Sequence, residues 1–127
     1  MTVLIDSWAW IEYWKGGKHA SSAATHIEGD EEAVVASINL TELYLWVSRY
    51  YDEATAKKYT EAVERRCYVI PLDKEIALSA AKLKLRHKMG IADSVVLATA
   101  RHANGKVVTG DPDFKDIDGV IFIGQQT

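Results

Sequence analysis

Residues 3–14 read VLIDSWAWIEYW, and they contain a complete strand-to-helix transition. Three apolar residues, Val3 to Ile5, are typical of a short buried strand. The turn-forming pair Asp6-Ser7 follows it. Three large apolar residues then recur at helical spacing, at Trp8, Ile11 and Trp14, before Gly16-Gly17 ends the pattern. A strand that passes through an acidic turn into a helix predicts the first unit of an α/β domain.

The same order of strand and helix continues along the chain. Further strands are expected at 33–36, 67–70, 106–109 and 120–123, and helices at 39–51, 53–66, 73–88 and 91–102. Strands separated by helices need right-handed crossovers, so we expect a mostly parallel sheet with helices on both faces. No repeat or linker interrupts the pattern, which predicts a single domain over residues 1–127.

Composition narrows the class of protein. A chain of 127 residues that is 48% hydrophobic can form one buried core. Its uncharged runs, such as 33–41, are shorter than the roughly 18 apolar residues that a membrane span needs. One cysteine, Cys67, allows neither an intrachain disulfide nor a thiolate metal site. We therefore expect a cytoplasmic protein without a membrane segment, whose net charge of -3 confines any nucleic-acid contact to local patches.

Acidic residues stand near the ends of the expected strands. Asp6 follows the first strand, Glu42 lies shortly after the second, and Asp111 follows the strand that ends at Thr109. Ligands of parallel α/β folds bind beyond the carboxyl ends of the strands, so these carboxylates are expected to converge there. Asp93, near the start of the helix at 91–102, is the fourth candidate.

Each of these acids also has a purely structural alternative. Asp6 and Asp93 are of a residue type that caps helices. Glu42 could complete a capping box with Asn39, three residues earlier. The segment 111–113 could form only a turn. As a set, however, converging carboxylates would repel one another unless a divalent cation neutralised them.

The donor types indicate which cation such a site would prefer. Oxygen ligands alone favour Mg²⁺ or Mn²⁺, whereas zinc prefers His or Cys, and the four histidines are scattered without ligand spacing. Ser7 has no histidine placed as its base, so we expect a supporting hydrogen bond from it, and the same role is open to Thr109. The chain has no phosphate-binding glycine loop, which argues against nucleotide-dependent chemistry.

Four segments, in this order, resemble the successive motifs of PIN-domain nucleases: LIDS at 4–7, NLTEL at 39–43, IADSVVLATA at 91–100 and TGDPDF at 109–114. The length of the chain is similar to that of the VapC toxins of type II toxin-antitoxin systems. The resemblance implies a PIN-like three-layer fold with a five-stranded parallel sheet. It also implies Mg²⁺- or Mn²⁺-dependent RNA cleavage, a homodimer and neutralisation by a cognate antitoxin.

The resemblance assigns expected roles to individual acids. By it, Asp6, Glu42 and Asp93 are the three core catalytic and metal-binding acids, and Asp111 is the fourth. Asp113 matches a second acid of the last motif, which lies near the metals in a supporting role. The sequence departs from the family pattern in two places, because bulky Trp8 and Trp10 follow the first motif and Gly110 and Pro112 flank Asp111. Both departures are expected to alter the shape of the pocket or the access of RNA.

A run of basic residues precedes Asp93. Its members Lys82, Lys84, Arg86 and Lys88 are candidates for contact with RNA phosphates. The alternative is a solvated helix face whose positive charges favour the helix C-terminus. The aromatic residues have helical spacings more typical of core or subunit contacts than of base stacking, although an exposed subset could hold an antitoxin helix.

We therefore expect a metal-dependent endoribonuclease that hydrolyses phosphodiester bonds as the toxin of a toxin-antitoxin pair. The sequence leaves the general base open between a carboxylate and a metal-bound hydroxide. Two alternatives also stay open. The chain could be a noncatalytic PIN-like binding or regulatory module whose acids hold a cation or a basic partner, or a nuclease that acts on DNA.

Overall fold

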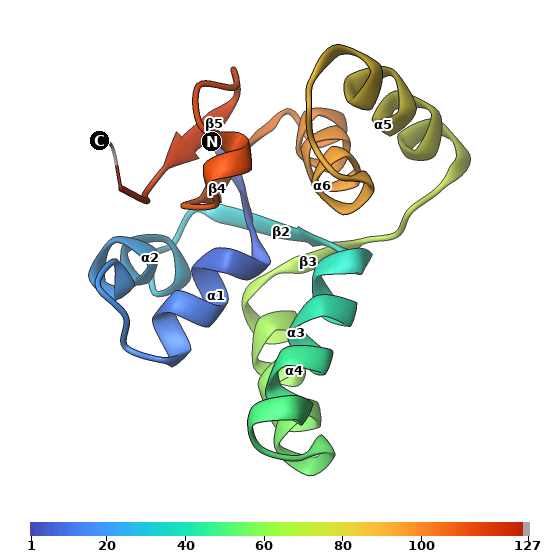
Figure 1. Ribbon diagram of the computed structural model, residues 1–127. Helices are drawn as coiled ribbons and strands as arrows, with labels where there is room; N and C mark the ends of the chain where they lie inside the picture. The colour runs from blue at the N-terminus through green and yellow to red at the C-terminus, as the bar shows by residue number, and fades with distance from the viewer. Residues whose placement is uncertain (126–127) are drawn as a thin grey trace.

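A five-stranded sheet lies between two layers of helices in the computed structural model, which describes residues 1–125 (Figure 1). The strands are β1 (Thr2–Ile5), β2 (Glu32–Ala36), β3 (Tyr68–Ile70), β4 (Gly105–Thr109) and β5 (Val120–Phe122). They pair in the order β3-β2-β1-β4-β5, and every pair is parallel. The expected α/β class and sheet are confirmed. The expected domain end, residue 127, lies outside the described residues.

Helices cover both faces of this sheet (Figure 1). One face carries α1 (Ser7–Trp14), α2 (Ala20–Ile27), α3 (Ser37–Tyr50) and α4 (Glu53–Arg66). The other carries the antiparallel pair α5 (Lys74–Arg86) and α6 (Ile91–His102), and a short 3₁₀ turn, η1 (Pro112–Phe114), leads from β4 towards β5. No helix among residues 1–125 combines the length and the apolar character needed to cross a bilayer.

Two apolar cores result from this layering. Successive side chains of β1 point to opposite faces, so Leu4 packs in the core under α5 and α6, whereas Val3 and Ile5 pack under α1 to α4. Helix α6 is the most deeply placed helix, since all its residues from Ser94 to Ala100 are buried. A strand and a helix buried on this scale give the carboxyl edge of the sheet a rigid base.

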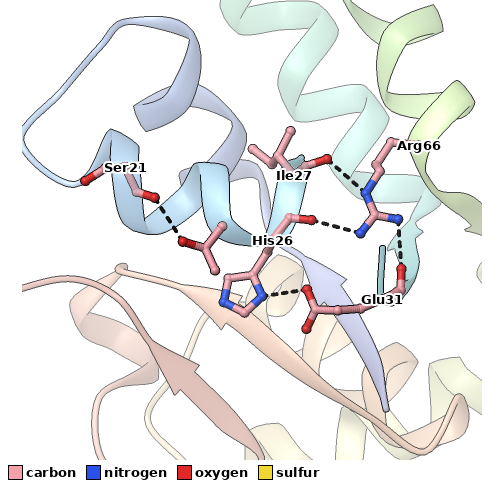
Figure 2. A network of polar contacts seen from close by, with 6 residues as sticks. Ser21, His26, Ile27, Glu31 and Arg66 are labelled. Carbon is pink, nitrogen blue, oxygen red and sulfur yellow. Dashed lines mark hydrogen bonds and ion pairs between the residues drawn. The ribbon is translucent and has the colours of Figure 1, made fainter. Parts of the chain in front are cut away.

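Helix α2 is absent from the helices expected above, although Ala20, Ala23, Ala24 and Ile27 recur at helical spacing and Ala23 and Ile27 are buried. Its apolar stripe is short and consists mostly of alanine, and a tertiary contact also holds its end. The guanidinium of Arg66, at the end of α4, donates hydrogen bonds of 2.8 to 2.9 Å to the backbone carbonyls of His26, Ile27 and Glu31 (Figure 2). His26 also pairs with the Glu31 carboxylate through Nδ1 at 2.9 Å. The chain between α2 and β2 is thus fixed by a residue far from it in sequence.

Candidate active site

The carboxyl edge of the sheet gathers acidic residues from four parts of the chain. Asp6 directly follows β1, and Asp111 lies two residues beyond β4. Between these neighbouring strands the order of the sheet changes direction, and parallel α/β sheets bind ligands at such a point. Glu42 lies on α3, which leaves the end of β2, and Asp93 lies in the first turn of α6.

Asp6 is buried, with only 5% of its surface exposed. It precedes α1 at the N-cap position, but its side chain caps no backbone N–H, so the capping alternative is wrong. Its carboxylate instead accepts a hydrogen bond of 2.8 Å from Thr109 Oγ1 and one of 3.2 Å from Asn39 Nδ2. Side chains from β4 and α3 therefore hold this carboxylate in a fixed position at the sheet edge.

Asn39, which is not among the site residues expected from the sequence, links the first two acidic segments. Its Oδ1 accepts the backbone N–H of Ala36 at 2.9 Å, which turns its Nδ2 towards Asp6 and Ser7. Ser7 Oγ in turn donates to Glu42 Oε1 at 2.8 Å. Asn39 itself thus closes the first turn of α3, and Glu42 accepts from Ser7, so the alternative in which Glu42 completes a capping box with Asn39 is wrong. The available sequence clue was an amide residue three positions beyond the strand end at Ala36, and the structure buries it completely.

Asp93, Asp111 and Asp113 form a second group, whose carboxylate oxygens lie within 4.8 Å of one another. Asp93 caps no helix N-terminus, because Gly90 occupies that position of α6. The turn expected at 111–113 is present, since Asp111 Oδ1 accepts the backbone N–H of Asp113 at 3.0 Å. The backbone N–H of Asp111 donates to Thr109 Oγ1 at 3.1 Å, so Thr109 connects this group to Asp6.

Burial and mutual repulsion raise the pKa of two of these acids. The pKa of Asp6 is raised to about 6, chiefly by burial and also by the charges of Glu42 and Asp111, against hydrogen bonds from the Thr109 hydroxyl and the Ser7 backbone that lower it. Burial likewise raises the pKa of Asp93 to about 7, with added repulsion from Asp111, Asp6, Asp113 and Glu42 in that order. The other four predicted acids therefore all lie within electrostatic reach of Asp93, and the repulsion among them favours binding of a cation.

The donor set fits a hard divalent cation. Asp93, Asp111 and Asp113 offer only carboxylate oxygens, and within residues 1–125 they are the only group of three or more acidic, histidine or cysteine side chains with metal-binding spacing. Oxygen-only sites suit Mg²⁺, Mn²⁺ or Ca²⁺ rather than zinc. A cation at this point would also relieve the repulsion that raises the pKa of Asp93. The cluster can therefore hold a metal ion.

Three of the four predicted RNA-contact residues lie in a cleft that reaches this cluster. The cleft has a volume of about 690 Å³, and its lining includes Lys84, Arg86, Lys88 and the acid Asp113. Lys82 does not line it and lies instead in a groove between α5 and α6, which Arg86 also lines. The acidic group is thus bordered by cations on its α5–α6 side.

Trp8 and Gly110, one residue from each departure from the family pattern, form a single structural feature. A Cβ placed on Gly110 would lie 2.3 Å from the Trp8 ring, closer than any real contact. The indole of Trp8 therefore rests against the bare backbone of Gly110, and the large residue requires the small one. Trp10, by contrast, is 2% exposed and belongs to the core.

This fold is that of a PIN domain. The PIN domain family model matches residues 3–120, and the chain belongs to that family. The resemblance stated from the four motifs is confirmed. No curated protein matches the sequence.

Solved structures with the same fold include several toxin–antitoxin proteins. A chain of a toxin–antitoxin complex from Klebsiella pneumoniae has a TM-score of 0.80 at 21% identity, with 98% of this chain and 99% of that chain covered. VapBC2 from Rickettsia felis, solved with a promoter DNA fragment, has a TM-score of 0.75 at 17% identity, with 99% of this chain and 100% of that chain covered. VapC20 from Mycobacterium tuberculosis is described as a toxin that cleaves the sarcin-ricin loop. It has a TM-score of 0.77 at 16% identity, with 93% of this chain and 96% of that chain covered.

Proposed function

We propose that this protein is a divalent-metal-dependent endoribonuclease and the toxin of a toxin–antitoxin pair. The observation that carries the proposal is the convergence of Asp93, Asp111 and Asp113 within 4.8 Å, beside a buried Asp6 whose position Thr109 and Asn39 fix. Such an arrangement leaves excess negative charge that a cation would neutralise. Membership of the PIN family and the fold shared with VapC20 support the same reading.

The chemistry proposed for the site is hydrolysis of a phosphodiester bond. A divalent cation supplies two things when bound, a lowered pKa for water and charge stabilisation on the phosphate. Asp93, Asp111 and Asp113 would hold it, with Asp6 and Glu42 as further ligands, directly or through water. Ser7, Asn39 and Thr109 position these carboxylates by hydrogen bonds, and supporting groups of this kind set the geometry of metal ligands. Mg²⁺ and Mn²⁺ are the expected ions.

RNA is the proposed substrate. The cleft lined by Lys84, Arg86 and Lys88 reaches Asp113, so a phosphate backbone held by these cations would run directly to the acids. The overall charge of -3 gives no general affinity for nucleic acid, which makes this local patch the electrostatic guide. We expect the enzyme to act in the cytoplasm, where the unpaired, buried Cys67 stays reduced.

We further propose a homodimer and a cognate antitoxin as protein partners. The structures of similar fold from Klebsiella pneumoniae and Rickettsia felis are toxin–antitoxin assemblies. A groove of about 330 Å³ between α5 and α6 is almost wholly apolar, with Leu72 and Ile91 exposed at it. The α3–α4 hairpin exposes Tyr50 and Tyr51 as well. Exposed apolar patches of this kind favour protein contacts.

The test is a cleavage assay with the full chain. Labelled single-stranded RNAs and DNAs of matched sequence are incubated with Mg²⁺, Mn²⁺ or EDTA, and the products are sized. The proposal predicts internal cuts in RNA only, with either cation and not in EDTA. Equal cutting of DNA contradicts the RNA assignment. Tight RNA binding without cutting under any metal condition supports a noncatalytic binding module instead.

A further inference from the structure

A second cleft borders the acidic group, since its lining includes both chain neighbours of Asp111. We propose that this cleft binds the base of the nucleotide next to the scissile phosphate, stacked on Trp8. The inference rests on the proposed function, because it concerns the same substrate. It adds a recognition site that the acids and the basic cleft do not supply.

The position of the cleft follows from the residues that line it. Its volume is about 480 Å³, and its lining includes Trp8, His19, Gly110, Pro112, Lys115 and Phe122. Trp8 lies two residues after Asp6, and Gly110 and Pro112 are the direct neighbours of Asp111. The segments that carry two of the acids therefore also form the walls of the cleft. A nucleotide whose phosphate lies at the acids has its base within reach of this space.

The chemistry of the lining suits a flat, partly polar ring. The Trp8 indole is partly exposed, and the His19 ring lies with its centroid 6.0 Å from that of Trp8. Phe122 adds a third aromatic ring, and Lys115 adds a cation. Single-stranded RNA is recognised mainly by stacking of its unpaired bases on aromatic side chains. The volume also falls within the roughly 300–1,000 Å³ usual for small-ligand sites.

The contact between Trp8 and Gly110 makes this platform rigid. Because the ring lies against backbone, its position is set before any ligand arrives. A preorganised aromatic ring loses little conformational freedom on binding, which favours affinity. The neighbouring tryptophans serve a different purpose, since Trp14 packs between Trp10 and Tyr59 at centroid distances of 5.5 and 4.8 Å. Trp8 is the tryptophan of α1 that lines the cleft.

The experiment uses a set of short single-stranded RNAs that share one cleavage site. In each RNA one nucleotide flanking the cut is abasic, so that the backbone stays intact while one base is missing. For the wild-type chain, we expect one abasic position to lower kcat/KM by roughly five- to hundredfold, the effect of losing one base–aromatic stack. The other abasic positions should have little effect. Equal cleavage of all the RNAs overturns the inference while the proposed nuclease function stands.

Two variants assign the effect to the ring. On intact RNA, Trp8→Leu should lower kcat/KM by the same factor that the sensitive abasic RNA loses with wild type, mainly through a higher KM. On that abasic RNA, Trp8→Leu should lower kcat/KM no further. Trp8→Phe should retain part of the preference for the intact RNA over the abasic RNA. Trp46→Leu, which removes a partly buried ring on α3 that packs on Tyr50, is the matched control and should behave as wild type. An undiminished abasic effect in folded Trp8→Leu overturns the assignment.

A binding measurement separates this inference from the nuclease proposal. Fluorescence anisotropy of the same RNAs with wild-type protein in EDTA reports base binding whether or not the RNA is cut. Weaker binding of the one abasic RNA supports the cleft, even if cleavage fails. Equal binding of intact and abasic RNAs, together with equal cleavage, excludes it. Because both readouts use the unmodified chain, they do not depend on how well the Trp8 variants fold.

Discussion

The Thr109 hydroxyl donates a hydrogen bond of 2.8 Å to Oδ2 of Asp6, although 103 residues separate the two in sequence. The bond joins the carboxyl ends of the neighbouring strands β1 and β4. The same hydroxyl accepts the backbone N–H of Asp111, so one buried oxygen positions two of the acids. The site thus depends on uncharged supporting residues as well as on carboxylates.

Replacement of this hydroxyl tests that dependence. Thr109→Val keeps the shape of the side chain but removes the donor that lowers the pKa of Asp6, so proton competition for the carboxylate should increase. We expect RNA cleavage to fall by about tenfold or more, as for other supporting groups around metal ligands, and the half-saturating metal concentration to rise. Thr99→Val is the control, because the Thr99 hydroxyl is equally buried but bonds only to its own helix. Equal effects of the two substitutions would contradict the role given to Thr109.

Asn39 provides a second test of the supporting residues. Asn39→Asp places another negative charge beside Asp6 and removes the two donated bonds to Asp6 and Ser7. We expect cleavage to fall by at least tenfold, together with a loss of stability of about 1–3 kcal/mol for the groups left unsatisfied. Steady-state cleavage and urea unfolding measure the two effects. Full activity in this variant would show that the chain Asn39–Ser7–Glu42 does not position the acids.

The raised pKa values of Asp6 and Asp93 predict how stability depends on pH. Both folded-state values, about 6 and about 7, lie above the ordinary value of 3.8, so the folded protein binds more protons than the unfolded chain between these limits. Stability contributed by these groups therefore falls as pH rises. In EDTA, we expect Tm to decrease from about pH 5 to about pH 8, and Mg²⁺ or Mn²⁺ to restore it at the upper end.

Asp93→Asn isolates this effect from that of the other titrating groups. The variant has no charge to bury at this position, so its Tm in EDTA should exceed that of wild type at about pH 8 and approach it at about pH 5. Differential scanning calorimetry across this range provides the comparison. A higher Tm for wild type than for Asp93→Asn at about pH 8 in EDTA would mean that the ionised Asp93 carboxylate stabilises the fold, which contradicts its raised pKa.

The contact between Trp8 and Gly110 predicts that the stability effects of substitutions at these two positions do not add. Gly110→Ala puts a methyl group 2.3 Å from the ring, and such overpacking costs roughly 1–3 kcal/mol. A smaller side chain at position 8 removes the clash, so the double variant Trp8→Leu/Gly110→Ala should be less destabilised than the sum of the two single variants. Urea unfolding of the four proteins in the cycle measures this. Additive losses would show that the two residues are independent.

Much of the fold could be predicted from local pattern alone. Strands β1 and β4 are buried on both faces, so apolar runs mark them in the sequence. Helix α2 gives a weaker signal, because its buried apolar face is short and mostly alanine, and Arg66 of α4 fixes its end through contacts distant in sequence. The strand-then-helix pattern therefore gives the architecture but misses elements that depend on distant contacts.

The candidate site shows the same division. Asp6 and Asp111 could be found because the ends of parallel strands meet at one edge. The role of Asn39 does not follow from local pattern, because its bonds to Asp6 and Ser7 cross more than 30 residues of sequence. Trp8 and Gly110 are separate departures in the sequence, since only the folded chain brings them into contact. Sequence position thus identifies the acids, whereas the structure identifies what holds and borders them.

The most direct test of the central claim compares RNA cleavage by wild type, Asp6→Asn, Asp93→Asn and the surface control Asp30→Asn over a range of Mn²⁺ concentrations. All four proteins are first shown to be folded by circular dichroism. The account predicts that wild type and Asp30→Asn cut RNA with the same dependence on Mn²⁺, and that the two site variants lose at least a hundredfold in rate, well beyond the ordinary loss of a supporting group. Undiminished cleavage by folded Asp6→Asn and Asp93→Asn would contradict an acidic, metal-dependent nuclease site at this edge of the sheet.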